Sequence, residues 1–491
     1  MKFGFLNRIF DAIPGIKNPL TPLSFREKLK WTAIIMSVYF VMFSAPAFGV
    51  NVAALTSPEF TIINTIFAAR IGTLVTVGIG PIVLSSIILQ MLQGAGAIKV
   101  DLNDPEQKAR FQSMQKLAAM AIAVIEAVIF TTTTVVLTSP AYFGIVVLQL
   151  AVCGIIIIYL DEIMTKYGIT SGINLFIAGG VAYAIVAGTG KILVPEAICS
   201  LGIGAGCLGG ATAIPNAILD FGPLFFAIIV FLISIYVLDM KIELPLVFSQ
   251  FRGVGGRLPI PFLYVSVLPV ILATSLTVSL GIWLRVAAHV TGPIAPVVHF
   301  LAYYTNSTAG AGPVLSGGLI YLMQPLSYLP YSTAYGGVGG YGTYFYILAT
   351  QTSPLYMPWG GAPLLIPEWV HFIIYALILV VLCVIFGRFW VGMTGQSAHD
   401  MAGQLQDVGW QIPGFRRDPR MTESVLNKYL PTITVLGSIF VALLAAFATV
   451  SGAIGNGMGI LLTAGIMYGV YQQLENENMF KGYPAIEKLL S

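Results

Sequence analysis

The sequence predicts an all-α membrane protein with about ten transmembrane helices in two inverted, pseudo-symmetric halves. Three observations support this fold class: the composition, the recurrence of apolar segments long enough to cross a bilayer, and the distribution of Lys and Arg between the loops. Of the 491 residues, 57% are hydrophobic and only 9% are charged. A soluble domain carries roughly 25% charged residues, so lipid must solvate much of this protein's surface.

A window of about 20 residues finds about ten apolar segments along the chain. They lie at 29–50, 72–95, 114–138, 142–163, 172–190, 218–239, 262–286, 369–392, 430–453 and 457–474. Of the 24 Lys and Arg residues, only Arg70, Lys191 and Arg285 fall in the loops opposite the N-terminus. The positive-inside rule therefore places both termini in the cytoplasm, and we expect a multi-pass protein of the cell membrane.

The spans divide into an N-terminal half, 29–190, and a C-terminal half, 218–474, joined by an external hinge loop at 191–217. Because each half has about five spans, an odd number, the two halves would have opposite orientations in the membrane. Pro81 and Pro269 each interrupt the second span of their half. The remaining segments are an amphipathic cytoplasmic N-terminal segment (1–28), cytoplasmic loops at 240–261 and 393–429, an external loop at 287–367 and a cytoplasmic tail (475–491).

The external loops carry two features that each allow two interpretations. Cys199 and Cys207 lie in the hinge loop and either form a disulfide or remain free thiols. Asn306-Ser307-Thr308 is either a glycosylation site or an unmodified turn. Neither feature changes the predicted topology.

The predicted spans have few side chains that could carry chemistry. Glu126 is the only acidic residue deep within a span, and we interpret it as a buried helix-packing group. Asp161 and Glu162 lie near the cytoplasmic end of span four, where water can solvate them. The four His residues show no metal-ligand spacing, and no nucleotide-binding or hydrolase motif occurs. We therefore predict no enzyme activity, no metal and no cofactor.

The segment between spans one and two is apolar but too short to cross a bilayer. Its large apolar residues are Phe60, Ile62, Ile63, Ile66 and Phe67. A short half-helix that folds back into the membrane fits this pattern, and an amphipathic turn on the outer leaflet is the alternative.

Several strings, in order along nearly the whole chain, carry a resemblance to a known family. They include Arg70-Ile71-Gly72-Thr73-Leu74, Gly78-Ile79-Gly80-Pro81, Tyr159-Leu160-Asp161-Glu162, Ser171-Gly172-Ile173, Gly414-Phe415-Arg416 and Gly459-Ile460-Leu461-Leu462-Thr463. In these strings the chain closely resembles the SecY family, in its archaeal and eukaryotic branch. The regions around 190–217 and 287–367 depart most from that family.

The resemblance implies the protein-conducting channel subunit of the Sec translocon. Such a channel moves unfolded polypeptides through a central pore, or releases helices sideways into lipid through a lateral gate. The gate would be formed by spans two and three facing spans seven and eight. The implied partners are SecE-type and small beta-type single-span subunits, the ribosome with its rRNA, nascent secretory or membrane polypeptides, and membrane lipid.

The resemblance also implies three sets of site residues. The first is a ring of aliphatic side chains, here called the waist: Ile79, Val83, Ile173, Ile177, Ile271 and Leu462. The second is a plug at about 60–69, with the apolar residues named above. The third is a ribosome-binding set on the two cytoplasmic loops: Arg252, Arg257, Arg416, Arg417 and Arg420. By themselves the six waist residues would be interpreted as packing residues, and the arginines equally as topological signals or lipid headgroup contacts.

The competing hypothesis is an inverted-repeat secondary transporter for a small solute, and a third is a structural membrane scaffold. A transporter would be expected to have polar, ion-coordinating breaks at mid-membrane depth. The inferred waist is aliphatic, which favours the polypeptide channel. A scaffold would leave the short apolar plug segment without a role.

Overall fold

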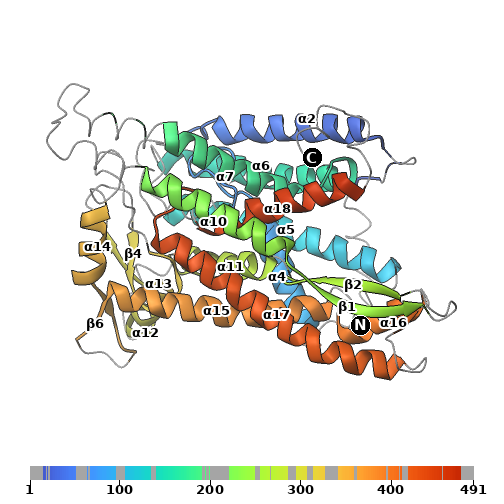
Figure 1. Ribbon diagram of the computed structural model, residues 1–491. Helices are drawn as coiled ribbons and strands as arrows, with labels where there is room; N and C mark the ends of the chain where they lie inside the picture. Colours follow the sequence, from blue (N-terminus) through green and yellow to red (C-terminus); the bar gives the residue numbers. More distant parts are fainter. Residues whose placement is uncertain are drawn as a thin grey trace.

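The computed structural model shows a bundle of long, roughly parallel helices with small sheets at its two ends (Figure 1). The structure describes residues 15–17, 19, 23–50, 64, 67–94, 105–133, 140–190, 194, 198, 221–248, 255–265, 267–285, 295–306, 313–326, 341–358, 362–393, 396–407, 410–411, 419–455 and 457–476.

Each predicted span coincides with a helix in the described part of the chain. The N-terminal half contains α2 (Phe25–Ser44), α4 (Gly80–Gly94), α5 (Pro105–Thr133), α6 (Phe143–Tyr167) and α7 (Gly172–Gly188). The C-terminal half contains α10 (Gly222–Asp239), α11 (Leu268–Leu284), α15 (Glu368–Met393), α17 (Pro419–Val450) and α18 (Gly457–Asn476). The predicted spans are therefore confirmed as helices.

Three of these helices are shorter than a typical transmembrane span. Helix α4 has 15 residues, and α7 and α11 have 17 each. At about 1.5 Å of rise per residue such helices cover only ~22–26 Å, less than the roughly 30 Å hydrocarbon core. Other helices, such as α6 and α15, are long and apolar enough to cross a bilayer.

Prolines mark the start of two of the short helices. Pro269 occupies the first turn of α11, and Pro81 is the second residue of α4. Each proline therefore lies inside its predicted span, 72–95 or 262–286, at the point where the non-helical first part ends and the helix begins. The missing N–H of proline is harmless in a first turn, where amides have no partner within the helix.

The two halves meet along two sets of helix contacts. On one side α4 and α5 contact α11, and α4 also contacts α15; on another, α7 contacts α18. One continuous hydrophobic cluster includes residues of both halves. On the outer surface, apolar residues such as Val41, Leu148 and Leu377 are more than 60% exposed, as expected where lipid is the solvent.

The loops at 240–261 and 393–429, predicted to be cytoplasmic, are joined by a small antiparallel sheet. Strands β1 (Lys241–Phe248) and β2 (Gly255–Pro261) form a hairpin in the first loop. Strand β7 (Trp410–Gln411), from the second loop, pairs with β1 through Val247 and Phe248. Helix α16 (Ala398–Asp407) lies at the same end of the bundle (Figure 1). The sequence analysis identified both loops but did not predict this pairing.

The loop 287–367, predicted to be external, contains helices and strands at the opposite end of the bundle (Figure 1). They are α12 (Ala295–Leu301), β3 (Tyr303–Asn306), β4 (Pro313–Gly317), α13 (Leu319–Met323), α14 (Tyr341–Thr350), β5 (Thr352–Leu355) and β6 (Leu364–Pro367). Strands β3 and β4 form one hairpin, and β5 and β6 form another. The all-α prediction is thus right for the spans, while strands occur in the loops on both sides.

A buried polar cluster attaches this external region to α15. The Glu368 carboxylate is 2.9 Å from Nδ1 of His371 and accepts hydrogen bonds from Tyr321, at 3.1 Å, and from Ser353. Nε2 of His371 lies 3.2 Å from the carbonyl oxygen of Gln324. Because Tyr321 lies in α13 and Ser353 in β5, the cluster joins three elements.

Candidate functional site

The six predicted waist residues lie in or beside four helices, two from each half: α4, α7, α11 and α18. Ile79 directly precedes α4 and Val83 lies within it; Ile173 and Ile177 lie in α7, Ile271 in α11 and Leu462 in α18. All except Ile173 are buried members of one hydrophobic cluster, against which Ile173 packs partly buried. None of the buried members is more than 7% exposed. These side chains are therefore packed against protein.

The backbone before α4 is folded back on itself and positions Ile79. The Ile79 amide donates a hydrogen bond of 2.9 Å to the carbonyl oxygen of Phe67. Gly78, between them, has a φ of +58°, and a Cβ there would lie 2.3 Å from the same Phe67 oxygen. Only glycine fits such a position without strain. The turn at Gly78 thus fixes the end of the plug segment against the first waist residue.

The end of the predicted plug is docked beside the waist. Phe67 is 2% exposed, and its ring packs beside Gly80: a Cβ at position 80 would lie 3.6 Å from the ring of Phe67. The carbonyl oxygen of Ala68 accepts a 2.6 Å hydrogen bond from the Tyr39 hydroxyl in α2. Ala68 also packs closely against Gly180 of α7. The other predicted plug residues, Phe60, Ile62, Ile63 and Ile66, lie outside the described residues.

The role of Tyr39 was not predicted from the sequence, although a hydroxyl group in the middle of an apolar span could have indicated it. A hydroxyl in the middle of an apolar span needs a hydrogen-bond partner when it is buried. Tyr39 is fully buried, and its ring stacks on Phe176 of α7 at a centroid distance of 4.6 Å. It therefore links α2 and α7 to the plug segment.

Glu126 lies close to the waist. It is 2% exposed, in agreement with the interpretation of a buried packing group. Its Oε2 lies 3.0 Å from the position that a Cβ of Gly80 would occupy. The absence of a side chain at Gly80 therefore makes room for this carboxyl group between α4 and α5.

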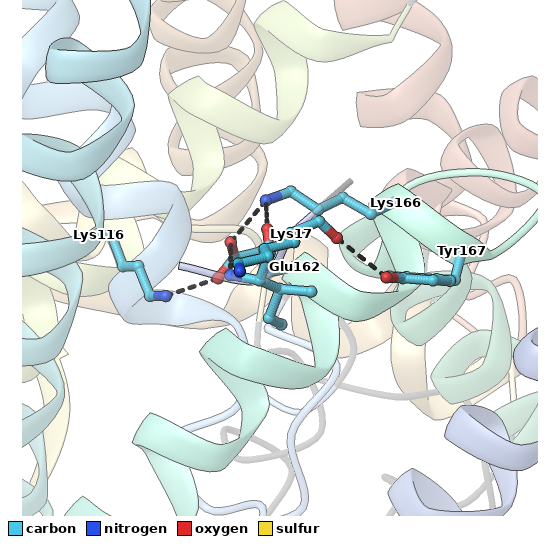
Figure 2. Close-up of polar contacts among 6 residues, drawn as sticks. Lys17, Lys116, Glu162, Lys166 and Tyr167 are labelled. Atoms are coloured by element: carbon cyan, nitrogen blue, oxygen red, sulfur yellow. Dashed lines mark hydrogen bonds and ion pairs between the residues drawn. The ribbon is translucent and has the colours of Figure 1, made fainter. Parts of the chain in front are cut away.

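The two acidic residues at the end of α6 have protein partners, which the sequence alone did not indicate. Glu162 forms ion pairs with Lys116 of α5 at 2.6 Å and with Lys166 at 2.9 Å (Figure 2). Asp161 accepts a 2.8 Å hydrogen bond from the amide of Ile173 in α7. Both carboxylates therefore act in helix packing.

The predicted ribosome-binding arginines are only partly described. Arg257 lies in β2, where its backbone is paired with Pro245 of β1. Arg420 lies in the first turn of α17 and is exposed. Arg252, Arg416 and Arg417 lie outside the described residues.

Within the described residues, no group of three or more His, Cys, Asp or Glu side chains could hold a metal ion. Cys153 and Cys383 are buried free thiols. Cys199 and Cys207 lie outside the described residues, as does the side chain of Asn306. Whether the two cysteines form a disulfide or stay free, and whether Asn306 is glycosylated or lies in an unmodified turn, therefore stay predictions.

The fold defines a class: a multi-pass helical membrane protein whose two halves pack against each other through one hydrophobic core. The SecY family model matches residues 73–471. A protein translocase subunit SecY from Methanocaldococcus jannaschii is 37% identical over 486 residues, covering 98% of this chain and 98% of that protein. The chain therefore belongs to the SecY family.

Solved structures of similar proteins have the same fold. One, described as the structure of a protein conducting channel, has a TM-score of 0.73 at 34% identity and covers 98% of this chain and 99% of its own. Another is Sec61 in a canine ribosome-channel complex from the endoplasmic reticulum, with a TM-score of 0.71, 33% identity and the same coverage of 98% and 99%. The predicted resemblance and the predicted fold class are confirmed.

The Gly78 turn generates a testable prediction. A Gly78→Ala variant should be less stable and should leak ions at rest, because a Cβ would push the Phe67 carbonyl away from Ile79. The positive φ alone costs an alanine roughly 1–2 kcal/mol. Thermal unfolding and resting conductance in planar bilayers measure the two effects.

Gly392→Ala is the matched control, since a Cβ there meets nothing within 4 Å. It should retain wild-type stability and conductance. A Gly78→Ala protein that matches this control in both measurements would contradict the role of the turn.

Proposed function

We propose that this chain is the central channel-forming subunit of a protein translocase in the cell membrane. It conducts unfolded polypeptides across the membrane and releases transmembrane segments sideways into lipid. The observation that carries the proposal is the burial of five of the six predicted waist side chains in one hydrophobic cluster, beside the packed end of the predicted plug segment. Membership of the SecY family and the similarity to a protein conducting channel support it.

The chemistry of the waist suits a passing polypeptide. Aliphatic side chains offer no hydrogen bonds to an unfolded chain and so bind none of its polar groups. A narrow apolar constriction also disfavours a continuous column of water, which limits ion leakage. Ile79 and Val83, like Ile173 and Ile177, are spaced i, i+4 and so share one face of their segment. Function requires no catalytic group and no cofactor.

A secondary transporter is the less favoured function. Ion-coupled transport usually requires ionisable or coordinating groups at mid-membrane depth. In the described spans Glu126 is such a group, but it packs against Gly80 between two helices. Saturable uptake of a small solute by the purified protein would favour the transporter.

The lateral gate in this proposal is the contact between α4 and α5 of one half and α11 and α15 of the other. Opening it would separate the halves, which we infer to be 29–190 and 218–474 with the external hinge at 191–217. The opposite contact, between α7 and α18, lies away from the gate and would stay closed. Parting the gate would expose the polypeptide path to lipid.

The cytoplasmic sheet supports a ribosome partner. Pairing of β1 with β7 joins the two loops whose sequences contain the predicted arginines, and of these Arg257 lies on β2 and Arg420 at the start of α17. Guanidinium groups suit the phosphates of ribosomal RNA. The similar canine protein is described in a ribosome-channel complex. In this proposal both termini are cytoplasmic, and SecE-type and small beta-type single-span subunits complete the complex.

The waist assignment predicts an ion leak. Replacing Ile173 and Ile177 together with serine should raise the resting conductance of the purified protein in planar bilayers several-fold. The serines would make the constriction wider and more polar, so water and ions could pass.

The control is Ile145→Ser with Leu148→Ser in α6, where the two side chains are 52% and 66% exposed to lipid. These changes are also apolar to polar but lie on the outside of the bundle, so the resting conductance should stay at the wild-type value. Equal conductance of the waist variant and this control, in folded protein, would defeat the pore assignment.

The docking surface predicts a change in salt dependence. Replacing Arg416 and Arg417 with Glu should weaken ribosome binding. Each phosphate contact that is lost lowers the number of counterions released on binding, and this release favours binding. The slope of log K against log salt should become shallower by about 2 if each arginine contacts one phosphate. A binding titration at several salt concentrations measures this slope.

Reversal of two other cytoplasmic charges, Arg26→Glu with Arg388→Glu, is the control, since both side chains are exposed but lie outside the two loops. The control should change the slope far less. If the loop variant keeps the wild-type affinity and slope, its arginines serve topology alone.

A further inference from the structure

The N-terminus of α7 is capped by a residue of the preceding helix. Asp161, in the last turns of α6, accepts a 2.8 Å hydrogen bond through Oδ1 from the amide of Ile173. The amide of Gly172 also hydrogen-bonds to this carboxylate. Ser171, at the usual capping position, makes no side-chain capping bond. A carboxylate at this end of a helix is favoured both by the free amides and by the helix dipole.

The two helices approach each other so closely at this point that only glycine fits. A Cβ on Gly172 would lie 2.6 Å from the Cα of Asp161 and 2.8 Å from its Oδ1. The neighbouring atom is backbone, which cannot rotate away as a side chain can. Any side chain at position 172 would therefore push α7 away from α6.

The neighbouring carboxylate, Glu162, has different partners. It pairs with Lys116 of α5 and with Lys166, and it accepts a 3.0 Å hydrogen bond from the amide of Ile16 (Figure 2). Lys166 also donates to the carbonyl oxygen of Ile16, and Tyr167 donates to that of Lys17 at 3.0 Å. Glu162 thus fixes the end of α6 to α5 and to the segment before α2, while Asp161 faces α7.

The capped amide belongs to a waist residue. Ile173 is held by Asp161 through its own backbone, and Ile177 follows one turn later on the same face. A helix turns by about 100° per residue, so even a one-residue shift of α7 would rotate both side chains off the pore axis.

We propose that Asp161 and Gly172 are positioning residues of the waist: the carboxylate cap and the close helix contact set the height and rotation of α7. They hold Ile173 and Ile177 at the constriction without touching the passing polypeptide. This inference rests on the proposed channel function.

The test measures the resting conductance of the full chain in planar bilayers, with thermal unfolding in parallel. Asp161→Ala and Gly172→Ala should each raise the conductance several-fold. Asp161→Asn should return it to near the wild-type value, because the amide oxygen can still accept the bond from Ile173. This rescue by a neutral acceptor separates positioning of α7 from a general effect of the charge.

Two controls are matched to these changes. Gly144→Ala adds the same Cβ where nothing lies within 4 Å, near the start of α6. Glu162→Ala removes the adjacent carboxylate, whose partners are not on α7. Both should keep the wild-type conductance, even if Glu162→Ala lowers the thermal stability.

The outcomes are distinct for this inference and for the channel itself. If the Ile173→Ser, Ile177→Ser variant leaks but Asp161→Ala and Gly172→Ala do not, the positioning role is overturned and the channel assignment stands. If Glu162→Ala leaks as much as Asp161→Ala, the effect is general loosening and the inference also fails. If the serine variant does not leak, the waist assignment and this inference fall together.

Discussion

The rest of the structure depends on one constraint: the backbone N–H and C=O groups between residues 67 and 79 need hydrogen-bond partners. This stretch is not helical, yet it leads directly into a span, and lipid provides no hydrogen bonds to free backbone groups. The chain meets this requirement internally: Ile79 bonds to Phe67, Leu74 to Ala45, and Ala47 to Gly72. Irregular backbone is tolerated at such a depth only where protein covers it. The surrounding helices therefore have to pack closely around this turn.

The arrangement of the proposed waist follows from this constraint. Because the irregular turns replace the first part of span two, α4 begins only at Gly80 and Ile79 stands at its entrance. Tyr39 and Gly180 bring α2 and α7 against the same segment. At the C-terminal end of α6, Asp161 and Glu162 fix α7 and α5 to α6. These contacts position the helices, and the aliphatic side chains of both halves pack in one hydrophobic core. Burial of these side chains, rather than any single polar contact, holds the halves together.

Hydropathy predicted the spans well, because a bilayer demands long apolar helices whatever their packing. It placed the start of α4 too early, since Gly72 and Gly78 do not interrupt the apolar segment in hydropathy but adopt positive φ, which ends a regular helix. The waist residues came from the family resemblance, because a buried isoleucine in a pore looks like any other in a core. The cap by Asp161 and the pairing of β1 with β7 depend on contacts between distant segments, which no local pattern reveals.

Site-specific crosslinking to a polypeptide arrested during translocation tests the central claim most directly. A photoreactive residue placed in turn at Ile79, Ile177, Ile271 and Leu462 would sample both halves of the waist. Residues Leu148 and Leu377 on the lipid-facing surface would serve as references. The account predicts crosslinks from all four waist positions to the same short stretch of the arrested chain, and none from the references. Crosslinks that are no stronger at the waist than at Leu148 and Leu377 would contradict it.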